Sequence, residues 1–224
     1  MMTKPPSAAR TRIKICGLTR VQDVRACAQR GADALGFVFY PPSKRFVSAV
    51  HAAELCTGLP AFISTVALFV NPDSQEVKDV IHTLNPSLLQ FHGDEDPSYC
   101  ASFGVPYLKA FRVGGPGLDT ATNVAKTCET FSQAAGWLFD SYTPAFGGSG
   151  QGFDHTLLSA VSSAQGAARP MILSGGLNAQ NARVAVQVLK PWAVDVSSGV
   201  EESPGVKSAQ KIDEFVQAIY LASV

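Results

Sequence analysis

Short apolar segments alternate with amphipathic ones along the whole chain. Continuous apolar runs rich in β-branched and aromatic residues predict buried strands, and they fall at 12–16, 34–39, 65–70, 87–91, 107–111, 137–140, 171–174 and 192–196. Apolar residues at helical spacing follow each run, at about 20–30, 48–57, 97–103, 119–134, 179–189 and 207–221, with further helices starting after Asp73 and near Asp154. The pattern therefore predicts eight strand–helix units.

Repeated units of this kind favour a closed barrel. Continuous apolar strands, rather than alternating ones, are typical of a parallel sheet that helices cover. Eight units of about 28 residues each fill the chain without a linker, which predicts an α/β fold with a single (β/α)8 TIM barrel over residues 12–224. An open doubly wound sheet is the alternative, but it usually carries GxGxxG after its first strand, and Cys16-Gly17-Leu18-Thr19 does not match.

Polar residues beside the helical segments predict where several helices start. Thr19 followed by Gln22 indicates a capping box for the first helix, Ser48 is expected to cap the second, and Asp73 with Glu76 is expected to cap the third.

Composition narrows the class of protein. Lys+Arg and Asp+Glu both number 18, so the formal net charge is zero, which argues against a nucleic-acid or membrane partner but allows a local basic pocket. No apolar run approaches the roughly 18 residues of a membrane helix. Residues 1–11 contain prolines and cations without an apolar core, so we expect a disordered tail rather than a secretory signal; a transit peptide is the weaker alternative.

The cysteines indicate a reducing compartment. The chain has five, widely spaced and without a CxxC pair, which predicts reduced thiols in a cytoplasmic protein with neither disulfides nor zinc. Cys16 differs from the other four because it ends the first predicted strand where a loop begins. That position suits chemistry, whereas the alternative is a small buried hydrophobic residue.

Polar residues gather after the predicted strands, where a barrel builds its active site. They are Cys16, Ser43-Lys44-Arg45, Gln90 and His92, Lys109 and Arg112, Asp140, Ser174-Gly175-Gly176, and Asp195 to Gly199. Glycines after the last two strands let backbone N–H groups approach an anion, and a following helix adds its positive end. Ser174, Gly175, Gly176, Ser198 and Gly199 are thus candidates for a phosphate site, although Gly175-Gly176 alone would also suit an ordinary tight turn.

Taken in order, these motifs resemble the phosphoribosylanthranilate isomerase family of tryptophan biosynthesis. The resemblance runs from about residue 12 to the end and is carried by Lys14-Ile15-Cys16-Gly17-Leu18-Thr19, Ala34-Leu35-Gly36-Phe37 through Ser43-Lys44-Arg45, Gln90-Phe91-His92-Gly93, Phe139-Asp140 with Gly147-Gly148-Ser149-Gly150, Ser174-Gly175-Gly176-Leu177-Asn178 and Asp195-Val196-Ser197-Ser198-Gly199-Val200-Glu201. Phe91 stands where leucine is commoner, and His155 stands where tryptophan is usual.

The resemblance implies an Amadori rearrangement of N-(5-phosphoribosyl)anthranilate to 1-(2-carboxyphenylamino)-1-deoxyribulose 5-phosphate. By resemblance, Cys16 is the general base and Asp140 the general acid. The substrate's iminium ion is the electron sink, so no metal or organic cofactor is expected. A thiol with a pKa of about 8.5 needs tuning, and a positive neighbour such as Lys14 would favour the thiolate. Asp140 must carry a proton in the substrate complex.

The remaining assignments concern binding. Arg45 is the candidate for the anthranilate carboxylate, since guanidinium grips a carboxylate with two hydrogen bonds; a solvated loop arginine is the alternative. Gln90, His92 and Asp195 are expected to contact the sugar or the amine, and His92 could instead be structural. The expected partner is a small sugar phosphate, bound by a monomer or a homodimer.

Three other functions are alternatives to this isomerase activity. The histidine-pathway aminoaldose isomerases typically carry one aspartate after strand one and another after strand five. This chain has Cys16 at the first position and no acid beside Phe111 at the second. Indole-glycerol-phosphate synthase normally has additional N-terminal helices, which a tail of eleven residues cannot supply. A non-catalytic sugar-phosphate binder would not need both Cys16 and Asp140.

Overall fold

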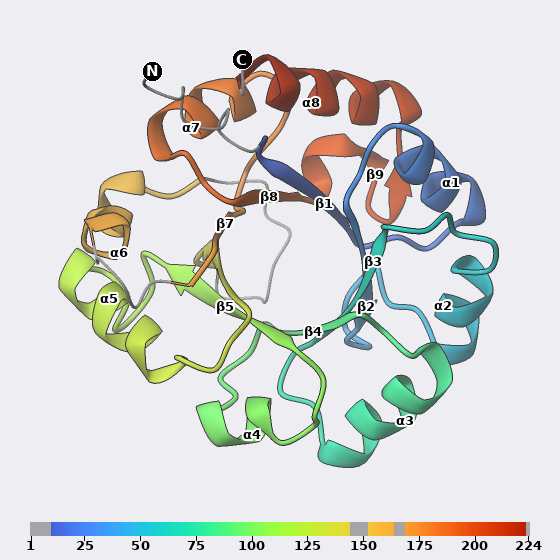
Figure 1. Ribbon diagram of the computed structural model, residues 1–224, viewed down its shortest axis with the longest axis horizontal. Helices are drawn as coiled ribbons and strands as arrows, with labels where there is room; N and C mark the ends of the chain where they lie inside the picture. Colours follow the sequence, from blue (N-terminus) through green and yellow to red (C-terminus); the bar gives the residue numbers. More distant parts are fainter. Residues whose placement is uncertain (1–9, 144–151, 164–168, 223–224) are drawn as a thin grey trace, which may run out of the picture.

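Eight parallel strands close into a barrel in the computed structural model, which describes residues 10–143, 152–163 and 169–222 (Figure 1). The strands follow one another around the barrel in chain order: β1 Arg12–Cys16, β2 Ala34–Phe39, β3 Ser64–Phe69, β4 Leu88–Phe91, β5 Tyr107–Val113, β6 Gly136–Ser141, β7 Met171–Leu173 and β8 Ala193–Val196. β1 pairs with β2 on one edge and with β8 on the other, where Lys14 lies opposite Asp195. The predicted barrel is confirmed, and the open sheet was the wrong alternative.

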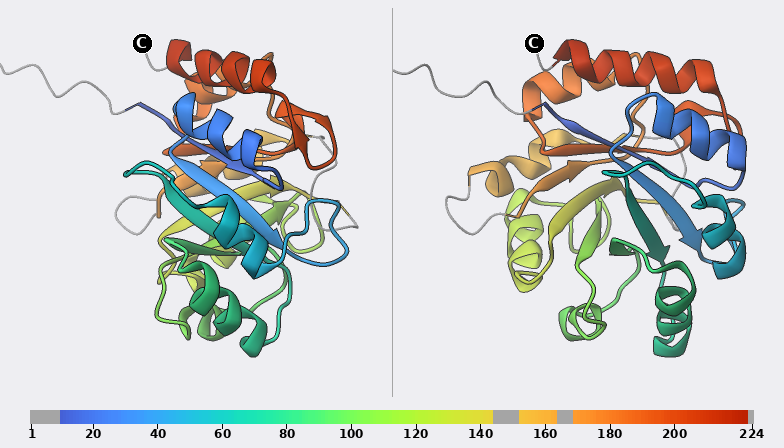
Figure 2. Two further views of the ribbon diagram at one scale, coloured as in Figure 1. Left: turned by 90° about the vertical axis from the view of Figure 1, so that its right-hand side faces the viewer. Right: turned by 45° about the vertical axis from the view of Figure 1, so that its right-hand side comes forward.

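Helices form a ring around the outside of the barrel (Figures 1 and 2). They are α1 Val21–Gln29, α2 Ala49–Leu55, α3 Ser74–Leu84, α4 Pro97–Ala101, α5 Ala121–Thr130, α6 Ser159–Ser163, α7 Ala182–Leu189 and α8 Ala209–Ala222, with a short 3-10 helix, His155–Leu158, before α6. Several are shorter than their helical patterns predict; α5, for example, occupies 121–130 rather than 119–134.

Two layers of apolar side chains stabilise this arrangement. Small and branched residues such as Val66, Leu138 and Ile172 form one cluster. A larger cluster lies between the strands and the helices, and it includes the fully buried Phe91. Successive strand residues point to opposite sides, so the same strands can bury apolar residues against the helices and direct polar ones into the barrel.

Local helix starts follow the sequence signals in two cases and depart from them in one. Ser48 accepts from the His51 N–H, and Asp73 accepts from the N–H groups of Gln75 and Glu76, as predicted. The predicted capping box at Thr19 and Gln22 is wrong. Arg20 is the N-cap residue of α1, and its side chain makes no capping hydrogen bond. Thr19 Oγ1 instead donates to the Gly205 carbonyl at 2.7 Å, because a partner far along the chain competes with the local one.

A short hairpin after β8 was not predicted. Strands β9 Glu201–Ser203 and β10 Val206–Lys207 form a two-stranded antiparallel sheet of their own. Figure 1 shows β9 beside α1 and outside the barrel wall. The hairpin brings two charged residues, Glu201 and Lys207, next to the loops after β1 and β2.

The tail predicted over residues 1–11 lies outside the described residues except for its last two. Arg10 forms a bidentate ion pair with Asp33, in which Nη1 lies 2.8 Å from Oδ2 and Nη2 lies 2.6 Å from Oδ1. The hydroxyl of the buried Thr11 donates a hydrogen bond to the Pro191 carbonyl. Arg10 and Thr11, at the end of the predicted tail, thus contact the barrel. Within the described ranges, no helix is long and apolar enough to cross a membrane.

Candidate active site

Most of the predicted site residues line one cavity at the carboxyl ends of the strands. Cys16, Arg45, Gln90, His92, Asp140, Ser174 and Asp195 all contribute to its wall. A smaller pocket adjoins it and is lined by Ser174, Gly175, Gly176 and Ser198. Asp140, Ser174, Asp195 and Ser197 line both. The structure thus brings the thiol, the carboxylate and the glycine loops together.

The β1 side of the cavity holds Cys16 in a tight, charged setting. Cys16 is 5% exposed, and a Cβ at Gly36 would lie 2.8 Å from its Sγ, so the neighbouring strand must carry glycine there. Lys14 Nζ lies 2.8 Å from Asp195 Oδ1. Burial raises the pKa of the Cys16 thiol, and Asp195 adds to this, although Lys14 and Lys207 act in the opposite direction. Lys14 therefore favours the thiolate as expected, but burial outweighs it.

A second group of polar side chains in the cavity wall comes from β4, the loop after it, and β6: Gln90, His92 and Asp140. Gln90 Nε2 lies 3.1 Å from His92 Nδ1, an arrangement in which the amide donates and Nδ1 accepts. The imidazole proton then sits on Nε2, which lies 3.2 Å from Asp140 Oδ2 but is not aligned for a good hydrogen bond. Asp140 Oδ1 accepts from the Ser141 N–H at 2.8 Å.

Two buried polar atoms of this group have no hydrogen-bond partner among the described residues: Gln90 Oε1 and His92 Nε2. Buried polar groups in folded proteins are nearly always paired, and exceptions mark sites that a water or ligand completes. The unpaired atoms therefore indicate a ligand-binding wall.

The glycine loops after β7 and β8 pack backbone against backbone. Gly175 and Gly176 have φ of +79° and +65°, which favours glycine, and a Cβ at Gly175 would lie 2.7 Å from the Ser141 nitrogen. A Cβ at Gly199 would collide with the Leu177 carbonyl. The result is a small pocket formed largely by main chain, which suits a phosphate group.

The helix expected directly after this loop starts later than predicted. α7 begins at Ala182, and a turn in which Asn181 Oδ1 accepts from the Asn178 N–H occupies the residues between. The glycine-rich stretch at 146–152 is one of the motifs that carry the family resemblance. Most of it lies outside the described residues.

Arg45 lies at the edge of the cavity with its guanidinium already paired. Nε and Nη2 contact Glu201 Oε1 and Oε2 at 2.8 and 2.7 Å. Sequence reasoning missed Glu201 and its second partner, Lys207, because their approach depends on the unpredicted hairpin. The Pro204-Gly205 dipeptide, a turn signal, could have revealed it.

Lys109 lies away from this site. Its Nζ pairs with Glu95 Oε2 at 2.8 Å and lies over the Phe131 ring, in a separate cavity outside β5. Within the described ranges, no group of three or more His, Cys, Asp or Glu side chains is arranged to hold a metal ion.

Fold and site together define a (β/α)8-barrel enzyme in which a thiol and a carboxyl group line one cavity and two glycine loops line the pocket beside it. The family model for N-(5'phosphoribosyl)anthranilate (PRA) isomerase matches residues 13–218. The chain therefore belongs to the phosphoribosylanthranilate isomerase family, as the sequence motifs indicated. It is an enzyme that isomerises phosphoribosylanthranilate in tryptophan biosynthesis.

Relatives and solved structures agree with this. The N-(5'-phosphoribosyl)anthranilate isomerase of Bordetella bronchiseptica is 57% identical over 210 residues, which cover 94% of this chain and 96% of the relative. That of Dechloromonas aromatica is 48% identical over 210 residues, again 94% of this chain and 96% of the relative. The crystal structure of the Thermotoga maritima isomerase has a TM-score of 0.84 at 36% identity, covering 94% of this chain and 98% of that one. Another isomerase structure, in complex with reduced 1-(o-carboxyphenylamino)-1-deoxyribulose 5-phosphate, has a TM-score of 0.81 at 33% identity, with coverage of 94% and 98%.

Proposed function

We propose that Cys16 and Asp140 carry out the isomerisation as general base and general acid. The reaction needs a proton delivered to the furanose ring oxygen, which opens the ring to an iminium ion. A base must then remove the C2 proton, giving an enolamine that tautomerises to the ketone. Asp140 supplies the first proton, and Cys16 accepts the second.

One observation carries this proposal: Cys16 and Asp140, from β1 and β6, line the same cavity, and Asp140 also lines the adjoining glycine pocket. A sugar phosphate anchored in the glycine pocket has its ring next to Asp140. The same ring is then within the cavity that Cys16 faces.

Burial raises the pKa of Cys16, which means that the resting thiol is protonated at neutral pH. Ring opening creates a cationic iminium beside it, and a positive charge favours the thiolate. The thiol therefore releases its proton to water before the thiolate takes the C2 proton. The iminium also acidifies the C2 proton. Acid catalysis by Asp140 therefore comes first and prepares the step at Cys16.

Binding is divided between three groups of residues in this proposal. Ser174, Gly175, Gly176, Ser198 and Gly199 hold the phosphate, Arg45 binds the anthranilate carboxylate, and Gln90, His92 and Asp195 contact the sugar or the amine. The unpaired Gln90 Oε1 and His92 Nε2 support the last assignment.

The experiment is a turnover assay on purified protein, following the loss of phosphoribosylanthranilate fluorescence. Turnover should persist with a chelator and without added metal or nucleotide, because the iminium is the electron sink. Cys16→Ala and Asp140→Asn should each lower the turnover number by at least about 10², as expected for a positioned acid or base. Turnover that a chelator abolishes and a divalent ion restores would contradict the proposal.

We also infer that residues 12–224 act as one catalytic domain, in the cytoplasm, as a monomer or a homodimer. Among the relatives, the Thermotoga maritima enzyme is described both as dimeric and as monomers generated from that dimer. Light scattering across a hundredfold range of concentration should give the mass of one or two chains, and a larger stable assembly would contradict this. Cell fractionation tests the location.

A further inference from the structure

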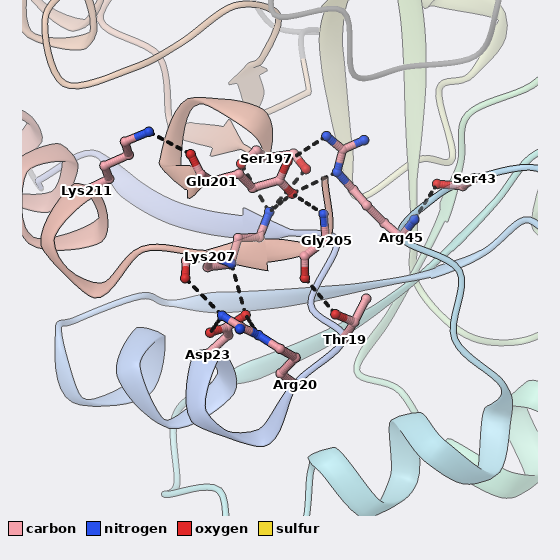
Figure 3. Close-up of polar contacts among 10 residues, drawn as sticks. All are labelled: Thr19, Arg20, Asp23, Ser43, Arg45, Ser197, Glu201, Gly205, Lys207 and Lys211. Atoms are coloured by element: carbon pink, nitrogen blue, oxygen red, sulfur yellow. Dashed lines mark hydrogen bonds and ion pairs between the residues drawn. The ribbon is translucent and has the colours of Figure 1, made fainter. Parts of the chain in front are cut away.

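Three parts of the protein contact Arg45, and Figure 3 shows two of them, Ser43 and Glu201. Glu201 takes two of its N–H groups in a parallel pair. The Arg45 backbone N–H donates to Ser43 Oγ at 3.1 Å. Its alkyl stem lies so close to Gly17, the residue after Cys16, that a Cβ there would collide with it. Protein contacts alone therefore fix the side chain of Arg45, a residue that lines the cavity.

Glu201 is itself fixed by a second cation. Lys207 Nζ lies 2.7 Å from Glu201 Oε1, and the Lys207 side chain is fully buried. The Gly205 N–H also donates to Oε1, and Lys211 Nζ donates to the Glu201 backbone carbonyl at 2.7 Å. Hydrogen bonds from Arg45 and Lys207 lower the pKa of Glu201 in spite of its burial.

The hairpin that carries Glu201 and Lys207 is fastened to the start of α1. The Lys207 backbone N–H donates to Asp23 Oδ2 at 3.0 Å, and Arg20 Nη2 donates to the Lys207 carbonyl at 3.1 Å. Thr19 Oγ1 holds the turn at Gly205. Figure 3 shows these contacts joining the hairpin to α1 below and to Arg45 beside it. The loops after β1, β2 and β8 thus form one frame around the guanidinium.

The charges of this frame do not cancel. Arg45 and Lys207 face a single carboxylate, which leaves one positive charge in a largely buried place. An isolated buried charge is costly, so a ligand anion is the complement that this cluster lacks. A guanidinium has five N–H groups, and Glu201 uses two of them, which leaves a second edge for another carboxylate.

We propose that Glu201 is the positioning residue for Arg45, and that the cluster of Arg45, Glu201 and Lys207 makes the enzyme specific for a substrate whose aryl amine carries a carboxylate. This rests on the proposed role of Arg45. Pre-organised donors bind a planar anion better than mobile ones, because ordering the side chain then costs nothing at the moment of binding. Glu201 therefore acts on affinity for the carboxylate and leaves the acid and base in place.

Position rather than charge should dominate the effect of Glu201→Gln. Burial already lowers the pKa of Lys207 with Glu201 beside it. Lys207 Nζ keeps the Ser197 carbonyl at 3.1 Å and the Ser197 hydroxyl at 3.3 Å as partners in this variant. Removal of the Glu201 negative charge would by itself strengthen the attraction of the cluster for an anion, so a weaker grip on the carboxylate reports the freed Arg45 side chain.

The test is a double-mutant cycle read by equilibrium binding. The Kd is measured by calorimetry for reduced 1-(o-carboxyphenylamino)-1-deoxyribulose 5-phosphate and for its phenylamino counterpart, which lacks the carboxylate. Glu201→Gln should raise the first Kd by at least about tenfold, the scale of one charge-assisted contact. The second Kd should change by less than about twofold, within the scatter of surface substitutions. In the Arg45→Ala background, Glu201→Gln should have no further effect on either ligand.

Glu202→Gln is the matched control, since it removes a neighbouring but exposed carboxylate, and it should leave both Kd values unchanged. Glu201→Asp retains a negative charge beside Lys207 and provides a second variant if Glu201→Gln unfolds; it should weaken only the carboxylated ligand. Equal losses for both ligands, no loss, or a full further loss in the Arg45→Ala background would overturn the proposal. Turnover of phosphoribosylanthranilate by the unmodified enzyme is measured alongside, and its absence would instead defeat the proposed function.

Discussion

His92 Nε2 lies 3.2 Å from Asp140 Oδ2, while His92 Nδ1 lies 3.1 Å from the Gln90 amide nitrogen. The imidazole therefore connects the end of β4 to the proposed acid on β6. Asp140 Oδ1 also accepts from the Ser141 N–H. Removal of the imidazole should leave the carboxyl group less well oriented toward the ring oxygen.

His92→Leu should accordingly lower the turnover number by about tenfold, below the loss for removing the acid itself. The Michaelis constant should change less than the turnover number, because the imidazole orients Asp140 in addition to contacting the sugar or the amine. Steady-state kinetics separates the two parameters, and His82→Leu, at an exposed position on α3, is the control. A raised Michaelis constant with normal turnover would leave His92 only its proposed contact with the substrate and would contradict an effect on Asp140.

The pH dependence should reveal how Cys16 is tuned. Burial raises its pKa, so kcat/KM should increase with pH along a limb that lies above the range of an ordinary thiol. Lys14 opposes this shift, and it also neutralises Asp195. Lys14→Met should therefore raise the thiol pKa further, move the limb to higher pH and lower kcat/KM at neutral pH.

Ultraviolet titration of the thiolate measures this directly, with Cys16→Ala subtracted to remove the other four cysteines. Burial raises the pKa of Cys27 to about 12 and that of Cys56 to about 11, so they ionise late. Lys78→Met, an exposed change of the same charge on α3, should shift nothing. A limb that Lys14→Met moves to lower pH would contradict the account.

The sequence predicted the barrel because each strand and helix carries its own signal. Strand runs such as 34–39 and caps such as Asp73 depend on neighbours in the chain. Thr19 and Glu201 depend instead on partners that lie 186 and 156 residues away in the chain, and no local pattern reports these. The motif that ends at Glu201 can be recognised in the sequence. The contact between Glu201 and Arg45 can be recognised only in the folded structure.

Phosphate binding by the glycine pocket predicts competitive inhibition by inorganic phosphate. Gly176 has a φ of +65°, so Gly176→Val forces a branched side chain into a strained conformation in the pocket wall. Strain on the order of 1–3 kcal/mol should raise both the Ki for phosphate and the Michaelis constant about tenfold.

Gly117→Val is the matched control, because Gly117 has a φ of +78° in open space away from the site. It should lower stability without changing the Ki. If Gly176→Val left phosphate inhibition unaltered, the pocket would have to bind some other group.

Phe91 should be a stability residue rather than a site residue. It is fully buried and its ring centroid lies 5.8 Å from Tyr99 and 5.9 Å from Phe103. Phe91→Ala should cost about 3–5 kcal/mol of unfolding free energy through the cavity it leaves. Phe91→Leu, which places the residue common in the family there, should cost about 1 kcal/mol.

Urea unfolding measures both, and Phe62→Ala, at a fully exposed position, should be nearly neutral. Equal losses for Phe91→Leu and Phe91→Ala would show that the aromatic cluster, rather than buried volume, sets the stability here.

The central claim is that Asp140 opens the ring and Cys16 then removes the C2 proton. The most direct measurement is the kinetic isotope effect on turnover with phosphoribosylanthranilate deuterated at C2, with Asp79→Asn and Cys56→Ser as controls outside the cavity. In Asp140→Asn the slow step precedes proton abstraction, so the isotope effect should fall toward unity. In Cys16→Ser, where a poorer base makes abstraction slower, the effect should exceed that of the unmodified enzyme. The reverse pattern would exchange the two roles, and near-normal turnover in both variants would contradict the account.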